Sequence, residues 1–122
     1  MAGECFYKSC TFLLDLPQDA LKDARLVHGL VDGQGPMDGI RFPHAWVEVS
    51  IGGCMFVWDP EAKALLQRHR YYEAGRIVED ELTRYTGAKA WMHVSQTGHA
   101  GPWEDRFDVW QNEALDELRK RA

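Results

Sequence analysis

Apolar residues recur at helical spacing near both ends of the chain, and this pattern predicts an amphipathic helix at each end. The first helix covers residues 4–15 and ends before Pro17, because the residue before a proline disfavours helical geometry. Its apolar positions are Phe6, Cys10, Leu13 and Leu14. The apolar positions of the last helix are Phe107, Trp110, Ala114 and Leu118. Each helix is therefore expected to turn one face toward a core.

Between the helices the pattern favours strands. Residues 24–32 are rich in Leu and Val, and residues 44–51 alternate apolar and polar side chains. Gly52-Gly53 is typical of a two-residue hairpin turn, after which residues 54–59 form the returning strand. Weaker patterns predict a helical turn at 18–23, a helical turn and then a loop at 60–72, a further strand at 76–86, a short helix at 88–95 and a loop at 97–103. The expected fold class is α+β, a small antiparallel sheet packed against the N-terminal and C-terminal helices in one domain, residues 1–122.

The hairpin decides which side chains share a face of the sheet. If Gly52-Gly53 alone make the turn, Trp46 lies opposite Asp59, and His44 and Asp59 are diagonal neighbours on one face. Diagonal neighbours on one face lie about 7 Å apart, which allows a hydrogen bond between an imidazole and a carboxylate. A three-residue turn would shift the register and separate His44 from Asp59. This more polar face carries His44, Trp46, Glu48, Ser50, Met55, Val57 and Asp59.

The opposite face of the hairpin is entirely apolar, so it is expected to be the buried one. It carries Ala45, Val47, Val49, Ile51, Cys54, Phe56 and Trp58. Cys54 is therefore expected to pack in the core rather than to react.

A reactive cysteine needs a stabilised thiolate, which a helix N-terminus and a nearby imidazolium supply. Cys5 opens the first helix and meets this requirement, while Cys10 lies more than a turn later on the apolar face and is expected in the core. Cys5, His44 and Asp59 thus form a candidate nucleophile, base and orienting acid. Each also has a structural interpretation, as a buried thiol, a half-exposed strand histidine and a turn-forming aspartate.

Composition restricts the possible partners. The net charge of −5 and the pI near 5.5 argue against a nucleic-acid partner. No segment approaches the roughly 20 apolar residues of a membrane span, and the first residues lack the pattern of a secretory signal, so a cytoplasmic location is expected. Three cysteines in that compartment argue against disulfides, and the five histidines show no metal-ligand spacing, so neither a metal nor another cofactor is expected. The oligomeric state stays open.

The ordered motifs resemble those of the papain-like and transglutaminase-like cysteine hydrolase superfamily, in particular its small bacterial and phage members. The matching residues are Gly3, Cys5 and Phe6, then Val27, His28 and Gly29, then His44, Ala45 and Trp46, then Asp59 and Pro60. They cover roughly the first half of the chain. The resemblance implies Cys5 as nucleophile, His44 as base and Asp59 as orienting acid, with the cysteine-bearing helix packed against an antiparallel sheet that bears the other two.

One feature departs from the superfamily pattern. Papain-like enzymes usually place a Gln several residues before the cysteine as an oxyanion donor, and only four residues precede Cys5. The backbone N–H of Cys5 can serve as one donor. The second is left open between Tyr7, Gln96 and a loop amide.

We therefore expect a cysteine hydrolase (a peptidase, amidase or isopeptidase) or an acyl transferase, which acts on a peptide or protein substrate through a thioester. Trp46 is expected to shape a pocket or shield the imidazole beside it, and His28, Tyr7 and His99 are further candidates for substrate contact. Two alternatives remain open. One is a catalytically silent domain of the same fold that binds a protein partner, and the other is a metal-dependent hydrolase.

Overall fold

The structure is a computed structural model that describes residues 2–121. It is α+β, with a five-stranded antiparallel sheet and a helix at each end of the described chain, as the sequence predicts. The sheet order is β4-β3-β2-β1-β5. The strands are β1 (Arg25–Asp32), β2 (Arg41–Ile51), β3 (Cys54–Asp59), β4 (Ala64–Gln67) and β5 (Thr83–Tyr85). The helices are α1 (Ala2–Leu14), α2 (Gln18–Leu21), α3 (Arg68–Gly75), α4 (Gly87–Thr97) and α5 (Asp105–Arg121), with 3-10 turns at Gly35–Met37 and Glu79–Glu81.

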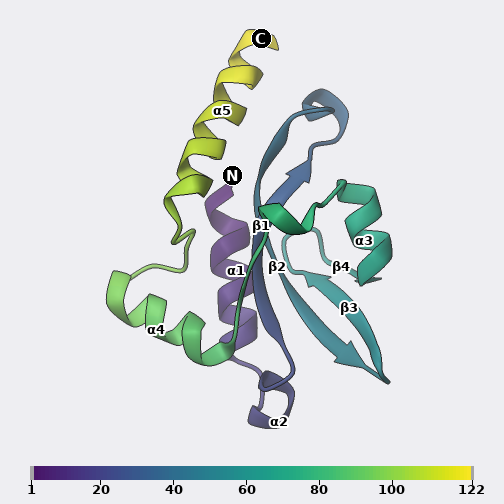
Figure 1. Cartoon of the computed structure of the whole chain (residues 1–122), viewed down its shortest axis with the longest axis vertical. Helices are drawn as coiled ribbons and strands as arrows, with labels where there is room; N and C mark the ends of the chain where they lie inside the picture. Colours follow the sequence, from purple (N-terminus) through teal and green to yellow (C-terminus); the bar gives the residue numbers. More distant parts are fainter. Residues whose placement is uncertain (1, 122) are drawn as a thin grey trace.

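Helices cover both faces of the sheet (Figure 1). On one face α1 packs along β2 and β1, and α4 and α5 lie on the same side. On the other face α3 packs against β3 and β4. The central strands are therefore buried on both sides, whereas the sequence led us to expect one buried face. Within residues 2–121 no helix combines the length and the apolar character needed to cross a membrane.

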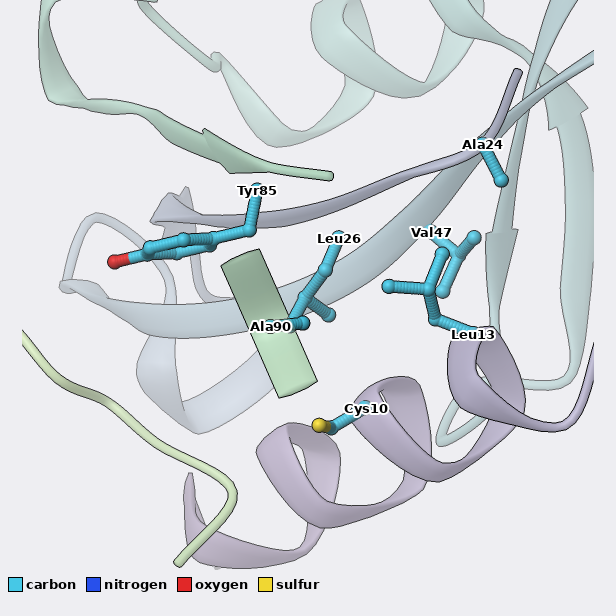
Figure 2. Close-up of a cluster of buried hydrophobic side chains, with 7 residues drawn as sticks. All are labelled: Cys10, Leu13, Ala24, Leu26, Val47, Tyr85 and Ala90. Carbon is cyan, nitrogen blue, oxygen red and sulfur yellow. The ribbon is translucent and has the colours of Figure 1, made fainter. Parts of the chain in front are cut away.

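The core under α1 contains Cys10, as predicted. Figure 2 shows Cys10 on α1 among Leu13, Leu26 and Val47, with Ala90 of α4 beside them. Burial raises the pKa of the Cys10 thiol to about 11. Cys10 is therefore a protonated, packed thiol at neutral pH.

The core under α3 depends on a glycine. Val27, Val57 and Trp46 form its centre. Gly29 lies opposite His44 on β1, and a methyl group there would come within 2.3 Å of Leu82 Cδ2 and 2.9 Å of Trp46 Cη2. The absence of a side chain at Gly29 leaves the space that Leu82 and the Trp46 indole occupy, which gives the valine-x-glycine motif a packing reason.

The predicted hairpin register is confirmed. Ile51 pairs with Cys54, and the ladder continues to Val47 opposite Trp58. Gly52 and Gly53 have φ angles of 60° and 83°, the left-handed backbone that a two-residue turn of this kind requires. At its other end the ladder stops at the Val47–Trp58 pair, so the next residue, Asp59, lies at the point where β3 leaves β2.

Three expectations were wrong. Cys54 is exposed, because the tip of the β2–β3 hairpin projects beyond the helices (Figure 1). The segment 60–72 contains β4 and the start of α3 rather than a turn and a loop. The strand expected over residues 76–86 covers only Thr83–Tyr85. β4 is an edge strand whose Leu65 and Leu66 are both exposed, so its sequence lacks the alternation that marks a half-buried strand.

A buried carboxylate explains how the polar face of β2 can be covered. Glu48 is 1% exposed, and it accepts hydrogen bonds from Trp46 Nε1 at 3.2 Å, from the hydroxyl of Tyr72 and from Arg84 Nε at 3.1 Å. Tyr72 belongs to α3 and Arg84 to β5. These bonds compensate the loss of water around the charge and join three elements of the fold.

Replacing Arg84 with alanine should therefore destabilise the fold strongly, because it removes the main cation beside the buried Glu48. We expect the free energy of unfolding to fall by about 3 kcal/mol in a urea titration. Glu79 is the exposed partner of Arg84, so Glu79→Ala is the matched control and should cost less than about 1 kcal/mol. Equal losses in the two variants would contradict the role given to Glu48.

His28 is a buried, neutral histidine on the α1 face of the sheet. Its ring lies 4.7 Å from that of Phe6, 4.9 Å from Tyr85 and 5.1 Å from Trp103. Neither ring nitrogen has a hydrogen-bond partner in the described part of the chain. Burial, followed by the charge of His93, lowers the pKa of His28 to about 3.

This burial predicts a specific dependence of stability on pH. Between the ordinary pKa of 6.5 and about 3, the unfolded chain binds a proton at His28 that the folded protein does not, so stability falls as the pH drops. The contribution approaches about 1.4 kcal/mol per pH unit. In urea titrations between pH 6.5 and 4, His28→Leu should show a shallower slope than the parent protein, whatever its absolute stability. Parallel slopes would show that His28 is protonated in the folded state.

Candidate active site

Helix α1 holds Cys5 against the middle of the sheet. Cys5 lies in the first turn of α1, is 0% exposed and forms a buried cluster with Phe6 and Ala45. One turn later, the Ser9 hydroxyl donates a 3.1 Å hydrogen bond to the backbone carbonyl of Ala45. Because Ala45 is the neighbour of His44 in β2, this bond ties α1 to β2 next to His44.

The side chains of His44 and Asp59 meet as the hairpin register predicts. His44 Nε2 lies 2.7 Å from Asp59 Oδ2, which also accepts a 2.6 Å hydrogen bond from the Tyr71 hydroxyl. Asp59 Oδ1 accepts the backbone N–H groups of Glu61 and Ala62, each at 3.1 Å. Asp59 thus both orients the imidazole and closes the turn after β3.

Cys5 approaches the same imidazole from α1. Cys5 Sγ, a ring nitrogen of His44 and a carboxylate oxygen of Glu61 all lie within 4.8 Å of one another. Since Asp59 occupies Nε2, Nδ1 is the nitrogen available to the thiol. The β2–β3 ladder stops at Val47–Trp58, so β3 does not cover the edge of β2 beside His44. The cysteine side chain can reach the imidazole there, although α1 covers the opposite face of the sheet.

The electrostatics of the pair favour a charged imidazole. Burial alone would lower the pKa of His44, but its hydrogen bonds to Asp59 and Cys5 and their negative charges raise it well above the usual value. Burial alone would raise the pKa of Asp59, and the bonds from His44 and Tyr71 instead hold it below its usual range. Burial and the adjacent Asp59 raise the pKa of Tyr71, so its hydroxyl stays a donor.

A hollow of about 340 Å³ leads to the imidazole. His44 and Glu61 contribute its polar floor, and α5 contributes much of its wall. The lining residues are Met37, Phe42, His44, Glu61, Gln111, Ala114, Leu115 and Leu118. Within the described part of the chain, Gln111 Oε1 is buried without a hydrogen-bond partner.

The residues expected to contact substrate are not all near this hollow. Trp46 is fully buried, with its ring 6.1 Å from that of His44, so it can shield the imidazole. His28 lies in the core on the α1 face. Tyr7 and His99 line a separate hollow of about 460 Å³ whose lining includes neither Cys5 nor His44. Gln96, the other candidate oxyanion donor, is exposed on α4. The substrate contacts of these residues stay predictions.

Several residues at the site were not singled out from the sequence. Ser9 and Tyr71 fix the two ends of the triad, and Glu61 and Gln111 line the approach to it. Glu61 had one available signal, its place two residues after Asp59. The others depend on how α1, α3 and α5 pack, which no local pattern encodes.

Comparison of the chain with protein-family models, with curated protein sequences and with solved structures finds no match. The superfamily resemblance therefore stays a prediction from the motifs in the first half of the chain. What the protein does must be inferred from the contacts of Cys5, His44 and Asp59.

The raised pKa of His44 can be tested by NMR of its ring nitrogens. The imidazole should carry both protons well above pH 6.5, because Asp59 and Cys5 stabilise the charge. Asp59→Asn should lower the pKa of His44, because it removes the carboxylate that accepts from Nε2. The exposed His99 provides an internal control, because its ring signals should be the same in the parent protein and in the variant. A His44 pKa unaffected by Asp59→Asn would contradict the coupling.

Proposed function

We propose that this protein is a cysteine hydrolase or acyl transferase with a papain-like/transglutaminase-like core, and that it acts on an amide bond of a peptide or protein. The observation that carries the proposal is the position of His44, whose Nε2 lies 2.7 Å from Asp59 while the ring approaches Cys5. A thiol, an imidazole and a carboxylate in this order are the parts of a thiol-based acyl-transfer triad. The core implied by the resemblance also places the cysteine helix against a sheet that bears the other two.

In the first half of the reaction, Cys5 Sγ attacks the carbonyl carbon of the substrate as a thiolate. The helix N-terminus and the charged His44 both favour negative charge at this position. The carbon–nitrogen bond then breaks, and the proton held by His44 passes to the leaving amine. The product is a thioester on Cys5 and a neutral imidazole that Asp59 keeps in orientation.

In the second half, water or an amine attacks the thioester carbon and His44 accepts the proton of the attacking group. The carbon–sulfur bond breaks, Cys5 leaves as thiolate and the imidazole is again charged. Water yields a carboxylic acid, and an amine yields a new amide. The same residues therefore support hydrolysis and transfer.

The substrate would enter through the hollow that ends at His44. Apolar side chains such as Phe42 and Leu115 line it, which suits an apolar group next to the reacting carbonyl. The unpartnered Oε1 of Gln111 can accept a substrate N–H, and the Cys5 backbone N–H can face the oxyanion. Because Cys5 is 0% exposed, the proposal requires the wall of the hollow to open during turnover.

The same burial favours a second candidate function. A fully buried thiol is also what a catalytically silent domain would carry, and such a domain would use its surface to bind a protein partner. In either case, a cytoplasmic location and the absence of a nucleic-acid partner remain predictions from the sequence.

Alkylation of Cys5 separates the two candidates. In a Cys54→Ser background, which removes the exposed thiol, iodoacetamide at pH 6 should modify Cys5 well ahead of Cys10, because a paired thiolate reacts at a pH where an ordinary thiol does not. His44→Ala should slow the labelling of Cys5 by about tenfold or more. His99→Ala is the matched control and should not change it. Labelling of Cys5 that is as slow as that of Cys10, or insensitive to His44, would refute the enzyme and leave the binding domain.

A further inference from the structure

Glu61 is a member of the site that acyl transfer does not use. Its carboxylate oxygen lies within 4.8 Å of both Cys5 Sγ and a ring nitrogen of His44. A carboxylate beside a thiolate repels it, so in the proposed reaction Glu61 would oppose the charge on which catalysis depends. A bound cation would reverse this effect.

We propose that Cys5, His44 and Glu61 bind Zn²⁺ and that the bound ion blocks the chemistry of the thiol. The blocking effect rests on the proposed function, whereas the binding of Zn²⁺ does not. The three residues come from α1, from β2 and from the turn after β3, and Cys5 and His44 are buried while Glu61 is partly exposed. Among residues 2–121 this is the one group of at least three such side chains whose ligand atoms converge.

The donor set selects the metal. One sulfur, one imidazole nitrogen and one carboxylate oxygen suit Zn²⁺, whereas Mg²⁺ and Ca²⁺ prefer oxygen ligands alone. Ligand atoms around a tetrahedral Zn²⁺ lie about 3.5 Å apart, given bond lengths of about 2.0–2.3 Å. The present spacing of up to 4.8 Å requires a closure of about 1 Å where the ligand atoms are furthest apart, and Glu61 is the one of the three residues that is not buried.

The surroundings of His44 and Glu61 already suit a metal site. Zinc-bound histidines usually donate their other ring N–H to a carboxylate, and His44 Nε2 is paired in this way with Asp59. Asp59 is itself fixed by Tyr71, and its Oδ1 also accepts the Glu61 backbone N–H. One carboxylate therefore orients two of the three ligands.

Three protein ligands leave a fourth position for water. His44 and Glu61 both line the 340 Å³ hollow, so the ion and its water have a route from solvent. When the ion is bound, it occupies the sulfur lone pair that would attack a carbonyl and the imidazole nitrogen that would carry the proton. Metal binding and acyl transfer are therefore mutually exclusive.

Cobalt provides a direct test of the metal site. Co²⁺ added to the Cys54→Ser protein should produce a thiolate-to-cobalt charge-transfer band in the near ultraviolet, and Zn²⁺ should displace it. Cys5→Ala should abolish the band, and Glu61→Gln should weaken Co²⁺ binding by about tenfold or more. Glu73→Gln removes an exposed carboxylate on α3 and is the matched control. Absence of the band, or an equal affinity in Glu61→Gln, would overturn the site.

Alkylation then tests the blocking effect. Zn²⁺ should slow the reaction of Cys5 with iodoacetamide, and the protection should be lost in Glu61→Gln when each protein is compared with its own metal-free rate. If Co²⁺ binds but Zn²⁺ does not protect Cys5, the exclusion is wrong. Because reactivity is also measured without metal, failure of the zinc site and failure of the triad give different results.

Discussion

The rest of the site depends on the hydrogen bonds that the Asp59 carboxylate accepts. Its two oxygens accept hydrogen bonds from His44, from Tyr71 and from two backbone N–H groups of the following turn. Through these bonds one side chain aligns β2, α3 and the turn that carries Glu61. A carboxylate that is 2% exposed tolerates burial only because all of these donors are present.

A second buried carboxylate, Glu48, performs a related task on the same face of the sheet. Its charge is stabilised by hydrogen bonds from Arg84, Tyr72 and the indole N–H of Trp46. Because of these bonds, α3 can cover a face of the sheet whose polar side chains would otherwise favour exposure to water. The Trp46 ring donates a hydrogen bond to Glu48, occupies the space left by the missing side chain of Gly29 and lies close to His44. The two carboxylates together make a polar face into a buried, ordered environment for one imidazole.

The sequence predicted those features that depend on neighbours along the chain. The Gly52-Gly53 turn fixed the hairpin register, and the register brought His44 to Asp59. The distance from Cys5 to His44 could not be derived, because it depends on how α1 packs on β2, through the core around Leu13 and Val47 and the hydrogen bond of Ser9. Cys54 was misplaced for a related reason, since strand alternation tells which face a residue is on but not how far the covering helix extends. β4 was missed because an exposed edge strand shows no alternation.

The hollow above His44 has a consequence for how the protein can change over evolution. The groups proposed to perform chemistry end at Asp59, whereas Gln111, Ala114, Leu115 and Leu118 of the wall belong to a helix near the other end of the chain. Substitutions on the inner face of α5 can reshape access to the imidazole without moving the thiol, the imidazole or the carboxylate. Different segments of the chain therefore determine reactivity and selectivity. Relatives of this protein can share the reactive residues and differ in the residues of α5 that control access.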